Sequence, residues 1–510
     1  MRWVLIRPLC QSGFYDPEIQ EPLGLEYLAS VLKDMGYPVI ILDSALNGLS
    51  DIKLARRAVS FQPDAIGFSI TTNRELDSVA AITAELKANL KEKDIFWIAG
   101  GNYPTTEPEN ALDKLPSYFH ILKYEGENSI RKICLLWRDG LLGILPRLIN
   151  GEPQMELDKL PFPERPYFHY LRNYGWAFNL QGSRGCCSAC KYCASNGMRG
   201  ALKVWRGRSP ENMTEEIAFL YENYRARSFN FVDEDFLGPP AQSQERAKRF
   251  AKGITERNLK ITFGIQVRPN SLSEAVIDYL SDVGLKYVFM GIESDNPRDF
   301  KIWGRAFCED TWRWVKYMQM KGIEVNAGTL MFHPDCTFEG IRNFAFNLHQ
   351  HGLLNYRTAV NRLDAMPGSF FHEKYVSEHP EENSQGIVRI PFREPVIELF
   401  YETVLRVLAP IEAPSMHALC AMPIVQTRKI LKNSETEYLV LKEINSNCDD
   451  RVSTCFFSLL EMFENEVFME QEIDEMAEEN TRFALKIANR LSTHGFVDSP
   501  ELLLQTISFV

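Results

Sequence analysis

Residues 177–193 read AFNLQGSRGCCSACKYC, an apolar run followed at once by a polar loop that holds four cysteines. The run AFNLQ has the length and character of a buried strand. Cys186, Cys190 and Cys193 follow it with the spacing CxxxCxxC. A loop of this size can wrap three thiolates around one metal centre, and soft thiolates suit iron–sulfur clusters or zinc. The segment therefore predicts a metal site directly after a strand.

The alternatives to an iron–sulfur cluster are structural zinc and simple buried cysteines. A structural zinc site requires a fourth protein ligand, and no histidine lies between His169 and His333. Cys187 could complete a four-thiolate set, although adjacent cysteines rarely chelate one tetrahedral ion. Burial is disfavoured because the segment is polar and contains glycine. Three protein ligands would leave one iron of a 4Fe-4S cluster open, as a catalytic site requires.

The other seven of the eleven cysteines are scattered singly along the chain. In a reducing compartment they do not form a disulfide framework, and we expect buried small hydrophobic side chains. They are Cys10, Cys134, Cys308, Cys336, Cys420, Cys448 and Cys455.

A regular alternation of strands and helices continues after the cysteine loop. Six βα units over about 190 residues predict a full or partial parallel barrel, a partial TIM-type (β/α)6 barrel, whose chemistry lies at the carboxyl ends of the strands. Beyond about residue 385 the pattern becomes largely helical and acidic. The predicted strands read AFNLQ, SFNFVD, ITFGIQ, KYVFMG, EVNAGTLM and RTAVNRL.

A separate α/β pattern precedes the cysteine loop. The apolar runs WVLIRP, YPVIILD, DAIGFSI and IFWIAGG alternate with helical stretches. This arrangement predicts a doubly wound, Rossmann-like parallel sheet with helices on both faces, and ligands bind such sheets beyond the carboxyl ends of the strands. Neither GxGxxG nor a P-loop is present, which disfavours a dinucleotide or nucleotide phosphate.

These patterns predict four regions. A ligand-binding sheet spans residues 1–145, and a partial barrel spans 179–385. Residues 146–178 connect them, and their many prolines and aromatic residues indicate an ordered connection rather than a flexible linker. A mainly helical region spans 386–510, where we expect the helices to close the open side of the barrel.

The net charge of -12 argues against a large phosphate-binding surface, so we expect no nucleic-acid partner. No stretch approaches the roughly 18 uncharged apolar residues of a membrane span. We therefore expect a cytoplasmic protein without a membrane partner.

The loop SRGCxxxCxxC after a first barrel strand resembles the signature of the radical SAM superfamily. That resemblance implies a 4Fe-4S cluster on Cys186, Cys190 and Cys193 whose free iron binds the amino and carboxylate groups of S-adenosylmethionine (SAM). Tyr192 matches an aromatic position near the adenine. Cys187 departs from the proline of many relatives but leaves the spacing intact.

Further residues match this superfamily in the same order. The run Asp233, Glu234 and Asp235 ends the second strand and would hold the SAM ammonium, although a run of helix N-cap residues is an equal reading of any one of them. Arg268 could face a carboxylate. Glu293 and Ser294 match a GxES element near the ribose or the methionine part, with a buried structural Glu293 as the alternative. Phe332 replaces an expected glycine in a later element, and Pro367-Gly-Ser resembles the segment that closes the barrel.

The amino-terminal region resembles the cobalamin-binding domain found upstream of many radical SAM enzymes. A flat corrinoid across the strand ends would explain small residues there, although ordinary tight turns are the alternative for each glycine. The histidine-supplying motif DxHxxG is absent. Thr71, Thr72 and Asn73 are the candidates for the lower side of cobalt. The contacts that this resemblance implies are Gly24, Ser69, Thr71, Thr72, Asn73, Gly100, Gly101, Asn102, Glu125 and Gly126.

Together these resemblances imply a cobalamin-dependent radical SAM methyltransferase that acts on an unactivated carbon of a small molecule, with an external electron donor such as flavodoxin or ferredoxin. Three alternatives stay open. The same cofactors could serve a ring rearrangement, a cyclisation or a polar methyl transfer. A methylthiotransferase acting on RNA would need an amino-terminal cysteine set, which Cys10 and Cys134 cannot supply. A non-catalytic cobalamin or redox sensor belongs to a different class.

Overall fold

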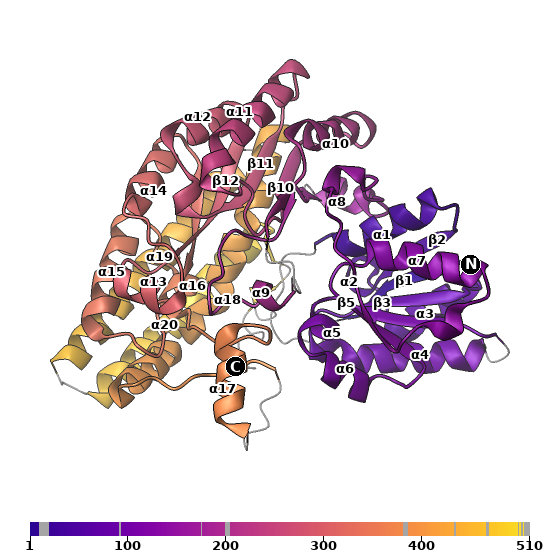
Figure 1. Cartoon of the computed structure of the whole chain (residues 1–510). Coiled ribbons are helices and arrows are strands. Elements are labelled where there is room, and N and C mark those ends of the chain that lie inside the picture. Colours follow the sequence, from indigo (N-terminus) through magenta and orange to yellow (C-terminus); the bar gives the residue numbers. More distant parts are fainter. Residues whose placement is uncertain are drawn as a thin grey trace.

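The computed structural model describes residues 1–9, 20–90, 93–174, 176–198, 204–380, 386–432, 435–465, 469–497, 499–500 and 503. Two α/β bodies lie side by side, and long carboxy-terminal helices pack against the second of them (Figure 1). The cysteine loop lies between the two bodies, close to the short helix α9 (Ser195–Met198).

The first body is built on a six-stranded parallel sheet in the order β2-β1-β3-β4-β5-β6. The strand order reverses at β1, so a crevice opens beyond the carboxyl ends of β1 and β3, where such folds bind ligands. The doubly wound prediction is therefore confirmed. The strands are β1 (Trp3–Arg7), β2 (Val39–Asp43), β3 (Ala65–Ser69), β4 (Phe96–Gly100), β5 (Phe119–Lys123) and β6 (Leu148–Asn150).

Helices cover both faces of this sheet because successive strand residues point to opposite sides. Val4 and Ile6 of β1 pack with α3 (Asp51–Ser60), α4 (Leu76–Asn89) and α6 (Pro108–Lys114). Trp3 and Leu5 pack on the other side with α1 (Leu23–Asp34) and α7 (Glu127–Arg138). Each face thus has its own hydrophobic core, as a parallel sheet buried on both sides requires.

The second body is a five-stranded parallel sheet in the order β13-β12-β11-β10-β7, an open partial barrel. Helices α10 (Pro210–Asn223), α11 (Pro240–Glu256), α12 (Glu274–Asp282), α14 (Thr311–Met320) and α15 (Phe338–Gln350) alternate with its strands. The strands are β7 (Phe178–Leu180), β10 (Ser228–Phe231), β11 (Thr262–Val267), β12 (Leu285–Glu293) and β13 (Glu324–Thr329).

The sixth predicted strand, RTAVNRL, is mostly wrong. Its first part forms helix α16 (Tyr356–Val360), and only one parallel bridge, Phe332 to Arg362, continues the sheet. The reason is local: Asn355 caps the helix in a reciprocal capping box with Thr358. This pair of hydrogen bonds satisfies two helix-terminal donors, which outweighs the strand preference of the β-branched residues.

The carboxy-terminal region forms three long helices, α18 (Pro395–Lys432), α19 (Glu435–Glu464) and α20 (Glu470–Thr493). They share one hydrophobic core with the partial barrel. Phe332, which stands at the expected glycine, is fully buried there and packs against Phe400, Tyr401 and Phe456. Its side chain therefore belongs to the core that joins the helices to the barrel.

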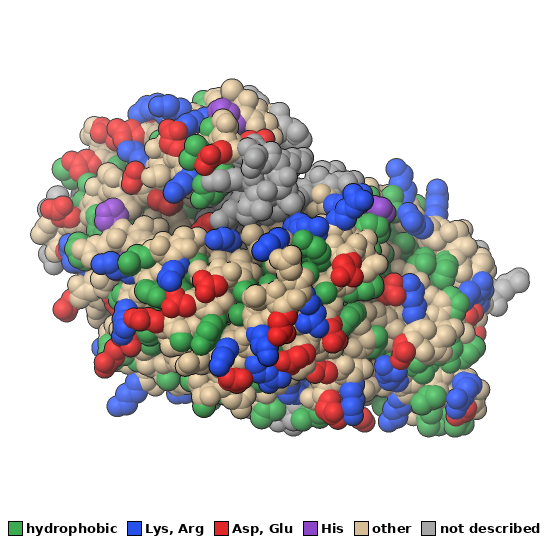
Figure 2. Space-filling model, turned by 90° about the horizontal axis from the view of Figure 1, so that it is seen from above, with side chains coloured by type: hydrophobic (Ala, Val, Ile, Leu, Met, Phe, Trp, Pro, Cys, Tyr) green, Lys and Arg blue, Asp and Glu red, His purple; other side chains and the backbone are tan. Residues whose placement is uncertain are grey.

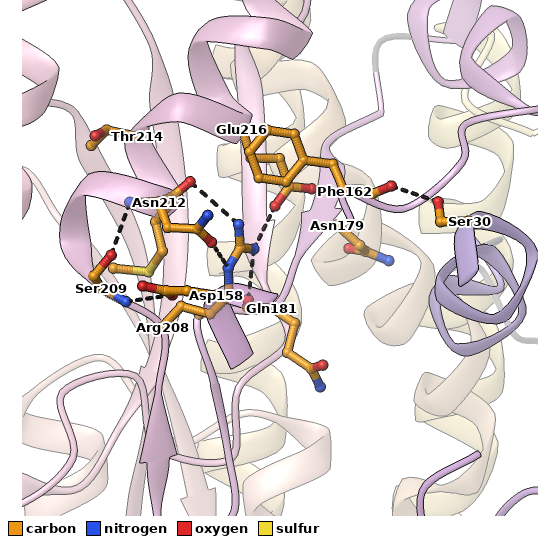
Figure 3. Close-up of polar contacts among 12 residues, drawn as sticks. Ser30, Asp158, Phe162, Asn179, Gln181, Arg208, Ser209, Asn212, Thr214 and Glu216 are labelled. Carbon is orange, nitrogen blue, oxygen red and sulfur yellow. Dashed lines mark hydrogen bonds and ion pairs between the residues drawn. The ribbon is translucent and has the colours of Figure 1, made fainter. Parts of the chain in front are cut away.

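The connection between the two bodies is ordered, as its composition predicted. Ser30 Oγ of α1 donates a 2.5 Å hydrogen bond to Phe162 O, and Asp158 accepts from Ser209 N at 2.9 Å on the barrel side (Figure 3). Arg165 is buried between the bodies and lies 3.0 Å from both Glu21 and Glu216.

On the face that Figure 2 shows, acidic and basic side chains are interspersed over the surface. Among the helices in the described ranges, none is both long enough and apolar enough to cross a bilayer.

Of the scattered cysteines, four are buried and Cys308 is half-buried, while Cys10 and the side chain of Cys420 lie outside the described residues. The buried ones are Cys134, Cys336, Cys448 and Cys455.

Candidate functional site

The cysteine loop leaves β7 through a two-stranded ribbon, in which β8 (Ser183–Arg184) pairs antiparallel with β9 (Arg206–Gly207). Gly185 follows with φ of +82°, a left-handed conformation that favours glycine and turns the chain toward Cys186. Within the loop, Cys193 N donates to Cys190 O at 3.0 Å, and Asn196 Nδ2 donates to the same oxygen at 2.8 Å. These bonds fold the last two cysteines of the motif into one compact turn.

The three motif cysteines differ in exposure from Cys187. Cys190 is buried, and Cys186 and Cys193 are half-buried, whereas Cys187 is exposed. Burial raises the pKa of the Cys190 thiol, with an opposing effect from the nearby guanidinium of Arg305. This arrangement leaves Cys187 on the outside of the loop.

The thiols of Cys186 and Cys193 lie close enough to that of Cys190 to raise its pKa. In the described part of the chain, no three His, Cys, Asp or Glu side chains converge closely enough to hold one metal ion. A cuboidal cluster binds each cysteine to a different iron, so its ligands stand farther apart than the ligands of one ion. Three thiolates, each bound to a different iron, would leave the fourth iron of a 4Fe-4S cluster open, so the chemistry of the donor set fits this group.

Asp233 holds the start of the cysteine loop. Its carboxylate accepts from Gly182 N at 2.9 Å and from the hydroxyl of Ser183, and its side chain is buried. Burial raises the pKa of Asp233 to about 6, although these two hydrogen bonds act in the opposite direction. The side chain thus anchors the loop and is turned away from solvent.

Asp235 and Arg268 form a second anchor. Arg268 Nε lies 2.8 Å from Asp235 Oδ2, and its Nη1 donates to Ser188 Oγ in the cysteine loop at 3.1 Å. The other carboxylate oxygen, Asp235 Oδ1, is buried and has no hydrogen-bond partner among the described residues. A buried acceptor without a partner is costly, and the ammonium of SAM would supply the missing donor. Glu234, which lies between Asp233 and Asp235 in the sequence, is half-buried.

Glu293 and Tyr192 meet through an arginine that the sequence did not single out. Arg305 Nη1 lies 2.5 Å from Glu293 Oε1 and donates to the Tyr192 hydroxyl at 2.8 Å. Tyr192 also contacts Trp303 edge to face, with ring centroids 5.6 Å apart. The two residues expected near different parts of SAM are thus joined into one network at the end of β12.

Ser294 lies beside this network but is occupied by its own helix. Its hydroxyl donates to Asp299 Oδ2 at 2.6 Å and accepts from Asn296 N at 3.1 Å. These contacts shape the start of α13 (Pro297–Trp303). The geometry therefore gives Ser294 a structural partner in place of an open hydroxyl.

A cavity of about 420 Å³ lies beyond the strand ends of the first body. Barrel residues Gln181, Arg184, Met198 and Val232 also line it. A Cβ placed on Gly24 would meet no protein atom within 4 Å, so a side chain there would project into open space. Seven predicted cobalamin contacts line the cavity: Gly24, Ser69, Gly100, Gly101, Asn102, Glu125 and Gly126.

Thr71, Thr72 and Asn73 are exposed and are not among the residues that line this cavity. Thr71 N donates to the buried carboxylate of Glu75 at 2.7 Å. Burial raises the pKa of Glu75 to about 7, against the hydrogen bond from Thr71. This acid shapes the turn that follows β3.

Glu125 and Glu127 bind two arginines of the β8–β9 ribbon. Arg184 lies 2.9 Å from Glu125 and 2.6 Å from Glu127, and Arg206 also pairs with Glu125. Burial alone would raise the pKa of Glu125, but Arg206 and Arg184 outweigh it and lower that pKa below its ordinary value. The predicted cobalamin contact Glu125 is therefore ion-paired to the barrel side of the cavity.

Sequence reasoning missed Arg184, Arg305 and Arg246 as parts of the site. Arg184 carries a usable signal, because it lies in the SRG that precedes the first cysteine. Arg246 donates to Gly182 O at 2.8 Å from α11, and Arg305 follows α13. Neither arginine stands in a recognisable motif, and only the fold brings them to the loop.

Two protein families match the chain. Residues 17–133 match the B12 binding domain, and residues 180–346 match the radical SAM superfamily. The first match covers most of the sheet that borders the cavity, and the second begins at Leu180 and includes the cysteine loop.

The individual relatives share less than 30% sequence identity with the chain. The chain is 28% identical over 337 residues to an uncharacterized methyltransferase of Pyrococcus horikoshii, a match that covers 63% of this chain and 71% of that protein. It is 26% identical over 302 residues to the anaerobic magnesium-protoporphyrin IX monomethyl ester cyclase of Synechocystis, covering 55% and 58%. Among solved structures, the cobalamin-dependent SAM radical enzyme OxsB superposes with a TM-score of 0.72 and 15% identity, covering 99% of this chain and 83% of OxsB.

Proposed function

From the matches to the radical SAM superfamily and to the B12 binding domain, we propose that the chain is a cobalamin-dependent radical SAM enzyme that methylates an unactivated carbon of a small molecule. Its cofactors are a 4Fe-4S cluster, SAM and cobalamin. One observation carries the proposal. The cavity at the strand ends is lined from both bodies, and Arg184 in its wall stands two residues before Cys186. A corrinoid in this cavity would therefore share a wall with the cluster loop.

When bound, the reduced cluster supplies an electron that cleaves SAM to a 5′-deoxyadenosyl radical, and cobalamin supplies a methyl carrier. The protein's part is to bind, orient and shield. Cys186, Cys190 and Cys193 would hold the cluster and would leave one iron open to SAM. Asp235 Oδ1 would accept from the SAM ammonium, and Glu293 with Tyr192 lies on the β12 side of the same loop. The enclosing bodies limit the access of water to the radical.

The methyl-transfer part of this proposal is supported by three relatives whose names identify them as a methyltransferase or a methylase. The test is anaerobic incubation of the reconstituted protein with SAM that carries a deuterated methyl group, a reductant, cobalamin and a pool of candidate small molecules. We expect a product that is heavier than its substrate because one deuterated methyl group has replaced one hydrogen. Turnover of SAM without any labelled product would contradict methylation.

A second reaction on the same cofactors is favoured by one specific observation, the likeness to the anaerobic cyclase of Synechocystis. A cyclase would convert its substrate without incorporating the labelled methyl group. The same experiment therefore separates the two reactions. A correctly assembled protein that never consumes SAM would instead favour a cobalamin or redox sensor.

The electron that reduces the cluster must come from outside the chain, since no reductant is among the three cofactors. We propose a low-potential carrier of the flavodoxin or ferredoxin type. Reduction of the cluster by such a carrier, followed by its electron paramagnetic resonance signal, is the measurement that checks this. A cluster reduced by dithionite alone and by neither carrier would contradict it.

A further inference from the structure

The β8–β9 ribbon joins the cluster loop to the cavity through two neighbouring arginines. Arg184 and Arg206 stand opposite each other in the antiparallel ladder. Arg184 is two residues from Cys186, so a displacement of Arg184 is transmitted to the cluster loop over a very short length of chain. The ribbon is thus the direct covalent neighbour of the first cluster ligand.

The partners of both arginines belong to the other body. Glu125 and Glu127 flank Gly126 where the turn after β5 leads into α7, whose first residue is Glu127, and all three line the cavity. Arg184 Nη1 lies 2.9 Å from Glu125 Oε2, and Arg184 Nη2 lies 2.6 Å from Glu127 Oε1. A planar guanidinium that binds two carboxylates at once fixes their orientation as well as their distance.

Further contacts complete the arrangement. Arg206 pairs with Glu125 and donates to Gln154 O at 2.5 Å, while Gln154 N donates to Glu125 Oε2 at 2.8 Å. The side chains of the four charged residues are only 6–19% exposed. Ion pairs with so little solvent around them are screened weakly, so they hold their geometry in salt.

We propose that Arg184 and Arg206 are positioning residues that set the separation between the cluster and the corrinoid, by holding the turn of residues 125–127 against the cluster loop. This inference rests on the proposed function, because it requires both cofactors. It assigns to Glu125 an indirect role: the carboxylate orients the cavity wall through the arginines and is not itself a ligand of the corrinoid.

The test uses the full-length protein with its cluster reduced and with cob(II)alamin bound, two paramagnetic centres whose separation pulsed dipolar spectroscopy measures. In the unchanged protein we expect one narrow distance distribution. Arg184→Gln removes both ion pairs, and we expect a distribution at least about twice as wide. Arg184→Lys supplies a single point charge in place of the planar guanidinium. The width of its distance distribution should therefore lie between those of the unchanged protein and Arg184→Gln.

Two controls make the result specific. Arg249→Gln breaks the exposed ion pair between Arg249 and Glu211 on α11 and α10, and the distance distribution should not change. The distance distributions are recorded at a cobalamin concentration that saturates each variant, so that a wider distribution reports the separation of the two centres and not their occupancy. Should Arg184→Gln fail to fold, Glu127→Gln weakens the same fork with an isosteric side chain and serves in its place.

An unaltered distance distribution in Arg184→Gln would overturn the inference. Failure of the proposed function looks different: the unchanged protein itself would lack the signal of the cluster or of cobalamin.

Discussion

Arg305 and Glu293 form a 2.5 Å charged hydrogen bond at the end of β12, and the same guanidinium nitrogen reaches the hydroxyl of Tyr192 in the cysteine loop. Glu293 adopts φ of +65°, where side chains other than glycine are strained by about 1–3 kcal/mol. The sheet register shifts between Gly291 and Glu293, which turns this carboxylate toward the loop. A strained acid held by an arginine beside the cluster loop indicates a site built for a ligand.

Glu293→Gln should weaken SAM binding while leaving the cluster in place. The substitution keeps the shape of the side chain but removes the charge that pairs with the largely buried Arg305, so we expect a loss of SAM affinity of at least about tenfold, or 1.4 kcal/mol. Equilibrium binding of SAM to the reconstituted protein measures it. Asp278→Asn, which disrupts the more exposed pair with Lys321, is the matched control and should bind SAM normally. Equal affinities of the unchanged protein and Glu293→Gln would remove this role.

Gly197→Ala should disturb the cysteine loop because α9 packs directly on the segment Pro367-Gly-Ser. An added Cβ would lie 2.6 Å from Gly368 Cα and 2.7 Å from Gly368 O, and neither backbone atom can move freely. We expect a stability loss of about 1–3 kcal/mol and less iron per chain after reconstitution. Gly340→Ala, where the Cβ would meet Thr337 Oγ1 at 3.4 Å, is the control. Normal iron content in Gly197→Ala would show that this contact is dispensable.

Gly24→Leu should exclude cobalamin without unfolding the protein. The new side chain would enter the cavity, since a Cβ at this position meets no protein atom within 4 Å. We expect the dissociation constant of cobalamin to rise at least about tenfold. Gly143→Leu also meets no atom near its Cβ but does not line the cavity, and it should bind cobalamin normally. Unchanged binding in Gly24→Leu would place the corrinoid elsewhere.

Glu75 should make the first body less stable as the pH rises. Burial raises its folded-state pKa from 4.5 to about 7, so between these values the folded protein binds more protons than the unfolded chain. Stability therefore falls through this interval, by up to about 3 kcal/mol in all. Glu75→Gln still accepts from Thr71 N and cannot ionise, so it should be the more stable form at pH 8.

Hydrogen exchange of peptides covering β3 and α4 at pH 5 and pH 8 checks this prediction. From pH 5 to pH 8, the free energy of local opening should fall more in the unchanged protein than in Glu75→Gln. Parallel behaviour of the two proteins would mean that Glu75 ionises normally.

The sequence allowed much of the architecture to be predicted because apolar strands and glycine-bounded loops are local signals. Short buried runs such as DAIGFSI and SFNFVD identified strands correctly. The error at residues 357–363 also has a local origin, since the capping box of Asn355 was overlooked. The four domain boundaries stay predictions, although β6 shows that the start of the connection belongs to the first sheet.

Site residues could be predicted from the sequence only where they belong to a local motif. The cysteine spacing and the glycines of the strand ends are such cases. The ion pairs are not: Arg184 and Glu127 stand 57 positions apart, and Arg305 and Tyr192 stand 113 apart. Their meeting depends on how the two bodies dock and on where α13 ends, which no local pattern records. The roles assigned to individual SAM and cobalamin contacts also stay predictions.

The central claim is SAM cleavage at a cluster held by Cys186, Cys190 and Cys193, and the most direct measurement is 5′-deoxyadenosine formed by the anaerobically reconstituted protein with SAM and a reductant. The account predicts 5′-deoxyadenosine from the unchanged protein and from Cys187→Ser, whose thiol is exposed, and none above background from Cys190→Ser. Absence of 5′-deoxyadenosine from the unchanged protein with a fully assembled cluster, or equal amounts from Cys190→Ser, would contradict it.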